Sequence, residues 1–208
     1  MAALRFILLL LIFAVLGLFL LYPHIDWFSG VYLFFSTSLA IFQFFVYRHF
    51  AKSEEIRTIF YAQHLDKLWD KVVPLLGILE LAVFFDYSHH LIPFRFVRVP
   101  FQSLGLLLLL LACAWLVWVD RYFLQNFESH YRAGTFLSGG PFRYIHHPRY
   151  AGLALTRMAM LLIFGSIFAL ILSLIWLWLL HRRIRLEEAW LLSRFGDSYR
   201  SYLAHSGI

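Results

Sequence analysis

Six long apolar stretches constrain most strongly what this chain can fold into. A helix needs about 20 apolar residues to cross the hydrocarbon core of a bilayer. Within that core, only helices and closed barrels satisfy every backbone polar group. Hydrophobic residues make up 62% of the chain and charged residues 14%, whereas a soluble domain carries roughly 25% charged residues. The sequence therefore predicts an all-α integral membrane protein with about six transmembrane helices, at residues 3–22, 27–47, 72–88, 101–119, 150–164 and 166–181.

The first stretch and the last two need separate arguments. Arg5 precedes the first stretch, as in a signal peptide, but the apolar run is long and no small-residue cleavage site follows it. These features favour an uncleaved membrane anchor. The last two stretches are short and meet at Phe164–Gly165–Ser166. We expect them to form a helical hairpin.

Basic residues are distributed unevenly between the two sides of this topology. Of the 18 Lys and Arg residues, Arg95 and Arg98 fall on one side, Arg157 lies within a span, and the remaining fifteen fall on the other side. Cytoplasmic loops are enriched in Lys and Arg, so the richer side is expected to be cytoplasmic. This bias also accounts for the net charge of +6 without a nucleic-acid partner. We expect a multi-pass protein whose N- and C-termini are both cytoplasmic.

The topology divides one membrane domain, residues 1–208, into four parts. We expect four spans in 1–119, a cytoplasmic loop at 120–149, the hairpin at 150–181 and an amphipathic tail at 182–208. The hairpin leaves the cytoplasmic face and returns to it, so the loop and the tail should meet there. The lack of a sorting signal favours a bacterial inner membrane over the endoplasmic reticulum.

The sequence argues against several common chemistries. The ten histidines include no two that are separated by two to five residues, the spacing that places two imidazoles on one helix face to bind a metal. The chain has no P-loop, no G-x-G-x-x-G motif and no serine elbow. Glu80, Asp86 and Asp120 lie in or beside spans without any repeat, which is weak support for a transporter. No metal site is expected.

Two polar segments carry a family resemblance. The first is TFLSGGPFRYIHHPRYAG at 135–152, and the second is RIRLEE at 183–188, followed by F-G-x-x-Y-x-x-Y at 195–202. Their order and spacing resemble the isoprenylcysteine carboxyl methyltransferase family, whose broader group includes phospholipid N-methyltransferases. That family's pattern is T-L-V-T-x-G-x-Y-x-Y-x-R-H-P-x-Y-x-G, then a membrane hairpin, R-x-x-x-E-E and F-G-x-x-Y-x-x-Y. The match covers residues 134–203.

The resemblance implies an integral membrane enzyme that uses S-adenosylmethionine and a lipophilic acceptor entering from the bilayer. The cofactor would lie at the cytoplasmic membrane surface, between the loop and the tail. Glu187 would contact it from the tail, and Arg183 would hold the carboxylate of the acceptor. The residues that would line the cofactor are the backbone of Thr135, Phe136 and Leu137, together with Phe142, His147, Pro148 and Tyr150.

Three departures from the family pattern leave the acceptor open. Phe142 replaces a tyrosine, His146 replaces the arginine before His-Pro, and Gly134 stands where the eukaryotic enzymes have histidine. Carboxyl O-methylation of an isoprenylcysteine or lipid-like acceptor is the first expectation, because a carboxylate is already ionised and needs alignment rather than a base. The alternatives are phospholipid N-methylation and small-thiol S-methylation, for which His146 is a candidate base, and a non-catalytic protein that keeps the fold.

Overall fold

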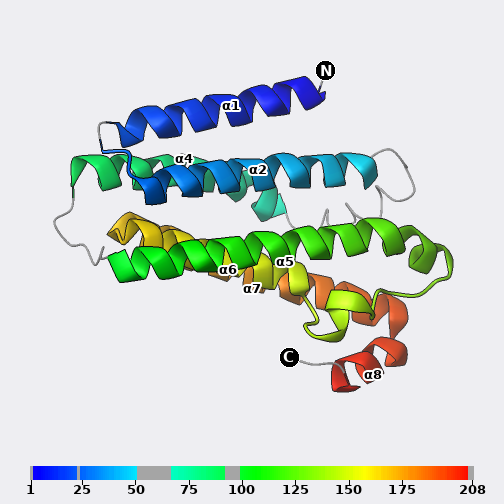
Figure 1. Cartoon of the computed structure of the whole chain (residues 1–208). Helices are drawn as coiled ribbons and strands as arrows, with labels where there is room; N and C mark the ends of the chain where they lie inside the picture. The colour runs from blue at the N-terminus through cyan, green and yellow to red at the C-terminus, as the bar shows by residue number, and fades with distance from the viewer. Residues whose placement is uncertain (1, 23, 51–66, 92–98, 206–208) are drawn as a thin grey trace.

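The computed structural model describes residues 2–22, 24–50, 67–91 and 99–205 (Figure 1). These ranges contain helices and no strands, which confirms the all-α prediction. The α-helices are α1 (Ala2–Leu21), α2 (Trp27–Phe50), α4 (Lys67–His89), α5 (Val99–Arg132), α6 (Pro148–Phe164), α7 (Ile167–Phe195) and α8 (Asp197–His205), and a 3₁₀ turn, η2, covers Gly140–Arg143.

Four of these helices are long and apolar enough to cross a membrane. They correspond to the expected spans at 27–47, 72–88, 101–119 and 166–181, and cover Trp27–Val46, Lys71–His89, Val99–His130 and Ile167–Phe195. The expected spans at 3–22 and 150–164 lie on α1 and α6. The apolar part of α1 at Leu8–Leu21 and the 17-residue α6 are shorter than a full crossing. The chain is thus a membrane protein with four candidate spans, and a count of six stays a prediction.

The helices form two layers that run side by side (Figure 1). Helices α1, α2 and α4 make one layer, and α5, α6 and α7 make the other, with α5 packed along α6. Successive helices run in alternating directions, so the start of α6 and the end of α7 reach the same end of the bundle. The core between the layers is aromatic: Tyr32, Phe84 and Phe164 are buried, with neighbouring ring centroids 5.0–6.2 Å apart.

A buried polar network also joins the two layers. The Tyr32 hydroxyl of α2 donates to Glu80 Oε1 of α4 at 2.7 Å, and Arg157 Nη1 of α6 donates to Glu80 Oε2 at 3.1 Å. The Arg157 guanidinium lies 4.9 Å from the ring centroid of Trp176 on α7. Buried charges are stable only when they are paired. The pairing of Glu80 with Arg157 therefore holds α4 against α6, although the two residues are far apart in the sequence. We refer to Tyr32, Glu80 and Arg157 as the interlayer network.

Helix α5 is longer than the span expected at 101–119. It continues as far as Arg132, so the segment expected as a loop at 120–149 is helical at its start. Past Gly105 the sequence has no glycine or proline until Gly134, and a helix does not stop where its residues become polar. Gly134 adopts φ +69°, and the Thr135 N–H donates to His130 O at 2.9 Å. This is the Schellman ending that glycine favours.

Candidate functional site

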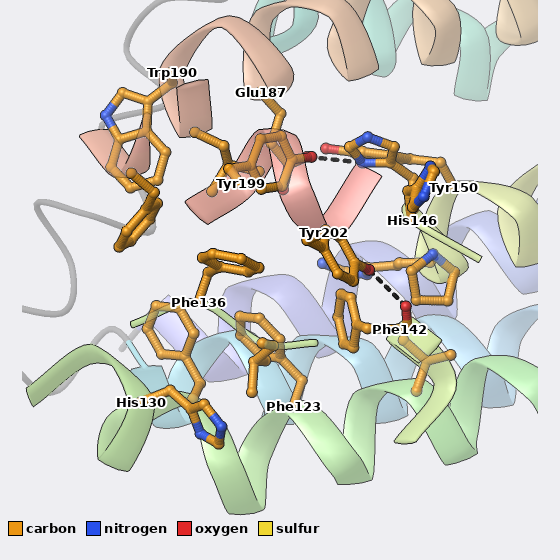
Figure 2. Close-up of a pocket in the computed structure, with 18 of the residues that line it drawn as sticks. Phe123, His130, Phe136, Phe142, His146, Tyr150, Glu187, Trp190, Tyr199 and Tyr202 are labelled. Atoms are coloured by element: carbon orange, nitrogen blue, oxygen red, sulfur yellow. Dashed lines mark hydrogen bonds and ion pairs between the residues drawn. The ribbon is translucent and has the colours of Figure 1, made fainter. Parts of the chain in front are cut away.

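A cavity of about 190 Å³ opens at the end of the bundle where loop and tail meet (Figure 2). Its walls come from the end of α5, the segment between α5 and α6, the start of α6, the second half of α7, and α8. A single buried water needs about 10–15 Å³ of such space, so this cavity has room for a small organic molecule. We call it the main cavity.

All nine site residues expected from the sequence line the main cavity. The hairpin of α6 and α7 turns at Gly165 and Ser166, where Ser166 Oγ accepts from the Ala169 N–H at 3.2 Å and starts α7. This turn returns α7 to the segment before α6, so residues more than thirty positions apart become neighbours. The nine are Thr135, Phe136, Leu137, Phe142, His147, Pro148, Tyr150, Arg183 and Glu187. Their roles toward a cofactor or an acceptor stay predictions.

Glu187 is the centre of a charged cluster in this cavity. The Tyr150 hydroxyl donates to the Glu187 carboxylate and accepts from the Arg183 guanidinium. His147 Nδ1 lies 3.9 Å from Glu187 Oε2, and His147 Nε2 lies 3.2 Å from Glu188 Oε1. Arg183 and Glu187 are four residues apart, on one face of α7, and Arg183 is only 9% exposed. The cavity thus presents a carboxylate and a guanidinium side by side.

An aromatic wall faces this cluster. The Phe136 ring lies 5.2–5.3 Å from the rings of Phe195, Tyr199 and Tyr202, measured between centroids. The Tyr202 hydroxyl donates to Phe142 O at 2.5 Å, which ties α8 to the loop. Burial raises the pKa of Tyr199, and the nearby carboxylates of Glu188 and Glu187 raise it further. Its phenol therefore stays protonated and neutral at physiological pH.

The loop packs closely onto α5 at its two glycines. A Cβ atom at Gly140 would lie 2.4 Å from Cε2 of Tyr122, and Gly140 adopts φ +56°. Both observations demand glycine, because other residues rarely adopt this φ and a side chain would displace the tyrosine ring. Gly139 and Gly140 thus permit a close approach of the loop backbone to α5, where the Tyr122 ring supports the loop.

Gly140→Ala should therefore destabilise the folded protein by about 1–3 kcal/mol and loosen the loop at the main cavity. Gly30→Ala is the matched control, because a Cβ at Gly30 meets nothing within 4 Å and its φ is not positive. Thermal unfolding in detergent would measure both changes. An equal effect of the two substitutions would contradict the close packing at Tyr122.

Residues 101–198 match the family described as phospholipid methyltransferase. This region is similar to phospholipid methyltransferases. The match confirms the resemblance at the level of the broader group of isoprenylcysteine and phospholipid membrane methyltransferases. No curated protein and no solved structure matches the chain.

The matched region contributes cavity residues that sequence reasoning missed. Phe123, Phe127 and His130 of α5 line the main cavity opposite α7, and Figure 2 shows Phe123 and His130 below Phe136. Their spacing of four and three residues is that of one helix face, a signal that becomes visible once α5 is extended beyond its apolar span. Val46 of α2 adds a wall residue from outside the matched region.

Asp120 has a partner that the sequence did not indicate. Its Oδ1 lies 3.3 Å from Arg149 Nε, and Gln43 Nε2 of α2 donates to its Oδ2 at 3.5 Å. Asp120 is 2% exposed, so its charge requires this pairing. The ion pair links α5 to the residue after Pro148, and so supports the start of α6 at the cavity.

His146 is placed differently from His147. Among the described residues, none forms a hydrogen bond with the buried Nε2 atom of His146. Leaving a buried polar atom unpaired costs about 1–3 kcal/mol.

His146, His147 and Tyr150 line both the main cavity and a second cavity of about 320 Å³ between α6 and α7. We call the second cavity the side groove.

Proposed function

We propose that this chain transfers a methyl group from S-adenosylmethionine to a lipid-like acceptor at the cytoplasmic surface of a membrane. One observation carries the proposal: loop and tail residues of a phospholipid methyltransferase domain meet around one cavity. The four candidate spans indicate a membrane protein, so a lipid acceptor in the bilayer would lie next to the chain.

The chemistry of the main cavity suits this cofactor. Aromatic rings such as Phe136, Tyr199 and Tyr202 favour stacked or edge contacts with a planar base, and the Glu187 carboxylate suits an ammonium group. The residues that would hold the cofactor are Thr135, Phe136, Leu137, Phe142, His147, Pro148, Tyr150 and Glu187. When bound, S-adenosylmethionine supplies a methyl group on a positively charged sulfur.

Arg183 would hold the anionic group of the acceptor. Its guanidinium forms paired hydrogen bonds with either a carboxylate or a phosphate. Tyr150 holds it in place, and the burial of Arg183 excludes water, which strengthens its attraction for an anion. A lipid-like carboxylate, as in isoprenylcysteine, is one acceptor. The description of the matched family favours a phospholipid amine as the second candidate.

The first test of the proposal is cofactor binding. We expect calorimetry on the purified protein in detergent to detect S-adenosylmethionine, and Glu187→Gln to weaken this binding by roughly tenfold or more, because a hydrogen bond to a charged group contributes about 1.5–3 kcal/mol. Glu128→Gln is the matched control, since Glu128 pairs with Arg132 on the exposed end of α5. Absence of binding to the wild-type protein would refute the proposed function.

The acceptor class would follow from labelled methyl transfer in membranes. A base-labile methyl ester would identify a carboxylate acceptor, and a label retained after base treatment in a lipid amine would identify N-methylation.

A further inference from the structure

One face of α5 is exposed along most of its apolar length. Its residues recur every three or four positions, which is the spacing of a single helix face. Because α5 is long and apolar enough to cross a membrane, hydrocarbon would cover this face. We call it the α5 seam, and its exposed apolar residues are Leu104, Leu107, Leu111, Ala114 and Trp118.

The α5 seam changes from apolar to basic at one end. Trp118, its last apolar residue, is 43% exposed, and Arg121, one turn later on the same face, is also exposed. Tryptophan is enriched where a membrane meets water, so Trp118 indicates the depth of the interface. Arg121 then lies at the level of the lipid head groups. On the topology expected from the sequence, this end of α5 faces the cytoplasm.

The segment after α5 adds a second arginine and a second aromatic ring at this level. It folds back along the helix (Figure 1), with Gly140 against the ring of Tyr122. At the end of η2, the Tyr144 ring is 60% exposed and lies 6.5 Å from the Trp118 ring, measured between centroids. Its neighbour Arg143 is exposed as well. We call the group the arginine patch: Trp118, Arg121, Arg143 and Tyr144.

The arginine patch carries a net positive charge. Among the described residues, no carboxylate pairs with either of its arginines. Asp120 precedes Arg121 but is 2% exposed and pairs with Arg149, and Glu128 pairs with Arg132. The patch lines neither the main cavity nor the side groove. Its two guanidinium groups are therefore available to an anion that approaches from outside the bundle.

We infer that the α5 seam and the arginine patch together bind one anionic phospholipid. Its acyl chains lie along the seam, and its phosphate lies between Arg121 and Arg143, since guanidinium groups form paired hydrogen bonds with phosphate oxygens. Trp118 and Tyr144 flank the glycerol region at the interface. Basic residues beside a membrane helix attract the anionic lipids of the cytoplasmic leaflet. This lipid is neither cofactor nor acceptor, so the inference does not depend on the proposed function.

A second copy of the chain is the other occupant that a regular apolar seam suggests. Helices that pair in a coiled coil also present apolar residues every three and four positions. In a two-fold symmetric pair the same surface of both copies meets, so Arg121 of one copy would lie near Arg121 of the other. Like charges at such an interface repel, whereas a lipid phosphate neutralises them. The charge at the end of the seam therefore favours a lipid.

η2 connects the arginine patch to the main cavity. Phe142 lines that cavity, and its neighbour Arg143 belongs to the patch, so a bound phosphate holds η2 against α5. The N–H groups of Phe142, Tyr144 and Ile145 donate within this turn. Their hydrogen exchange should therefore slow several-fold when phosphatidylglycerol is added to the protein in detergent. Unchanged exchange would contradict the contact between the lipid and Arg143.

Native mass spectrometry of the purified protein tests the lipid directly. The wild type should retain phosphatidylglycerol in preference to phosphatidylcholine, whose head adds a positive charge to the same phosphate. Arg121→Gln and Arg143→Gln should each lower the retention of phosphatidylglycerol roughly fivefold, because one basic residue near an anionic lipid contributes about 1 kcal/mol. The double variant should lose more than about tenfold. Arg185→Gln, at an exposed arginine of α7, is the matched control and should retain the lipid.

Thermal unfolding in detergent gives a second measurement on the same variants. A ligand that binds only the folded state raises its melting temperature. Phosphatidylglycerol should therefore stabilise the wild type and Arg185→Gln but not the double variant, and unfolding without lipid would show that each protein is folded. Inorganic phosphate and glycerol phosphate, which lack the acyl chains, should not stabilise any of them.

Several outcomes would overturn the inference. They are equal retention of the two lipids, an equal loss of lipid in Arg185→Gln, and stabilisation by free phosphate alone. A dimer in detergent that Leu107→Ala and Leu111→Ala dissociate would assign the α5 seam to a second copy instead. A protein that binds phosphatidylglycerol at the patch but no S-adenosylmethionine would support the inference and refute the proposed function.

Discussion

Arg157→Leu is expected to destabilise the folded protein by about 3–5 kcal/mol, because it leaves the Glu80 carboxylate buried without a cation. Glu80 is 9% exposed and accepts hydrogen bonds from Tyr32 and Arg157. Once Arg157 is replaced, the Tyr32 hydroxyl cannot compensate the full charge. The substitution also removes the contact between the guanidinium and Trp176. Unfolding of the protein in mixed micelles would measure the loss.

A second substitution separates charge from packing in the same region. Combining Arg157→Leu with Glu80→Leu should recover most of the lost stability, because replacing a whole buried ion pair by apolar residues is often neutral or stabilising. Arg132→Leu is the matched control: Arg132 and Glu128 are 76% and 49% exposed, and an exposed pair contributes only about 0–1 kcal/mol. A double variant as unstable as Arg157→Leu alone would contradict the interlayer network as the cause.

Arg183→Ala is expected to reduce methyl transfer by roughly 10²–10³-fold, the usual effect of removing a preorganised charged donor from an active site. Cofactor binding should change little, because the aromatic wall and Glu187 remain. Turnover and calorimetry on the same preparation would measure the two properties. Arg183→Lys keeps the charge without the planar fork and should recover only part of the rate.

The control for Arg183 lies on the same helix. Arg185 is exposed and lies outside both cavities, so Arg185→Ala tests the effect of removing one positive charge from α7. It should retain cofactor binding and turnover. A loss of cofactor binding and turnover together in Arg183→Ala would refute the division of roles between Arg183 and Glu187.

Local patterns account for what could be predicted from the sequence. The apolar runs predicted the helices, and Gly165–Ser166 marked the turn between α6 and α7 that brings Arg183 and Glu187 to the loop. The helices and their turn depend on helical periodicity and on short connections, both of which can be read along the chain. The resemblance to a methyltransferase family implied which residues would meet, and all nine line the main cavity.

Features that depend on packing between distant helices could not be predicted. Glu80 and Arg157 are 77 residues apart, as are Gln43 and Asp120, and no local pattern in the sequence joins the members of either pair. Phe123, Phe127 and His130 of α5 were not predicted to line a cavity, because the expected span ended at residue 119, where polar residues begin. The helix continues through all three residues. The unpaired Nε2 atom of His146 is visible only once the side chains around it are placed.

The Asp120–Arg149 pair, with Gln43 beside it, has a consequence for how the protein can be divided. A fragment limited to residues 101–198 would carry Arg157 without Glu80 and Asp120 without Gln43. It would also lack Val46, Tyr199 and Tyr202 from the cavity wall. The region that matches the family is therefore smaller than the unit that we expect to fold and to complete the cavity. The N-terminal helices supply the carboxylate that pairs with Arg157 and the amide that contacts Asp120, so we expect the matched half to depend for its folding on a part of the chain that carries none of its motifs.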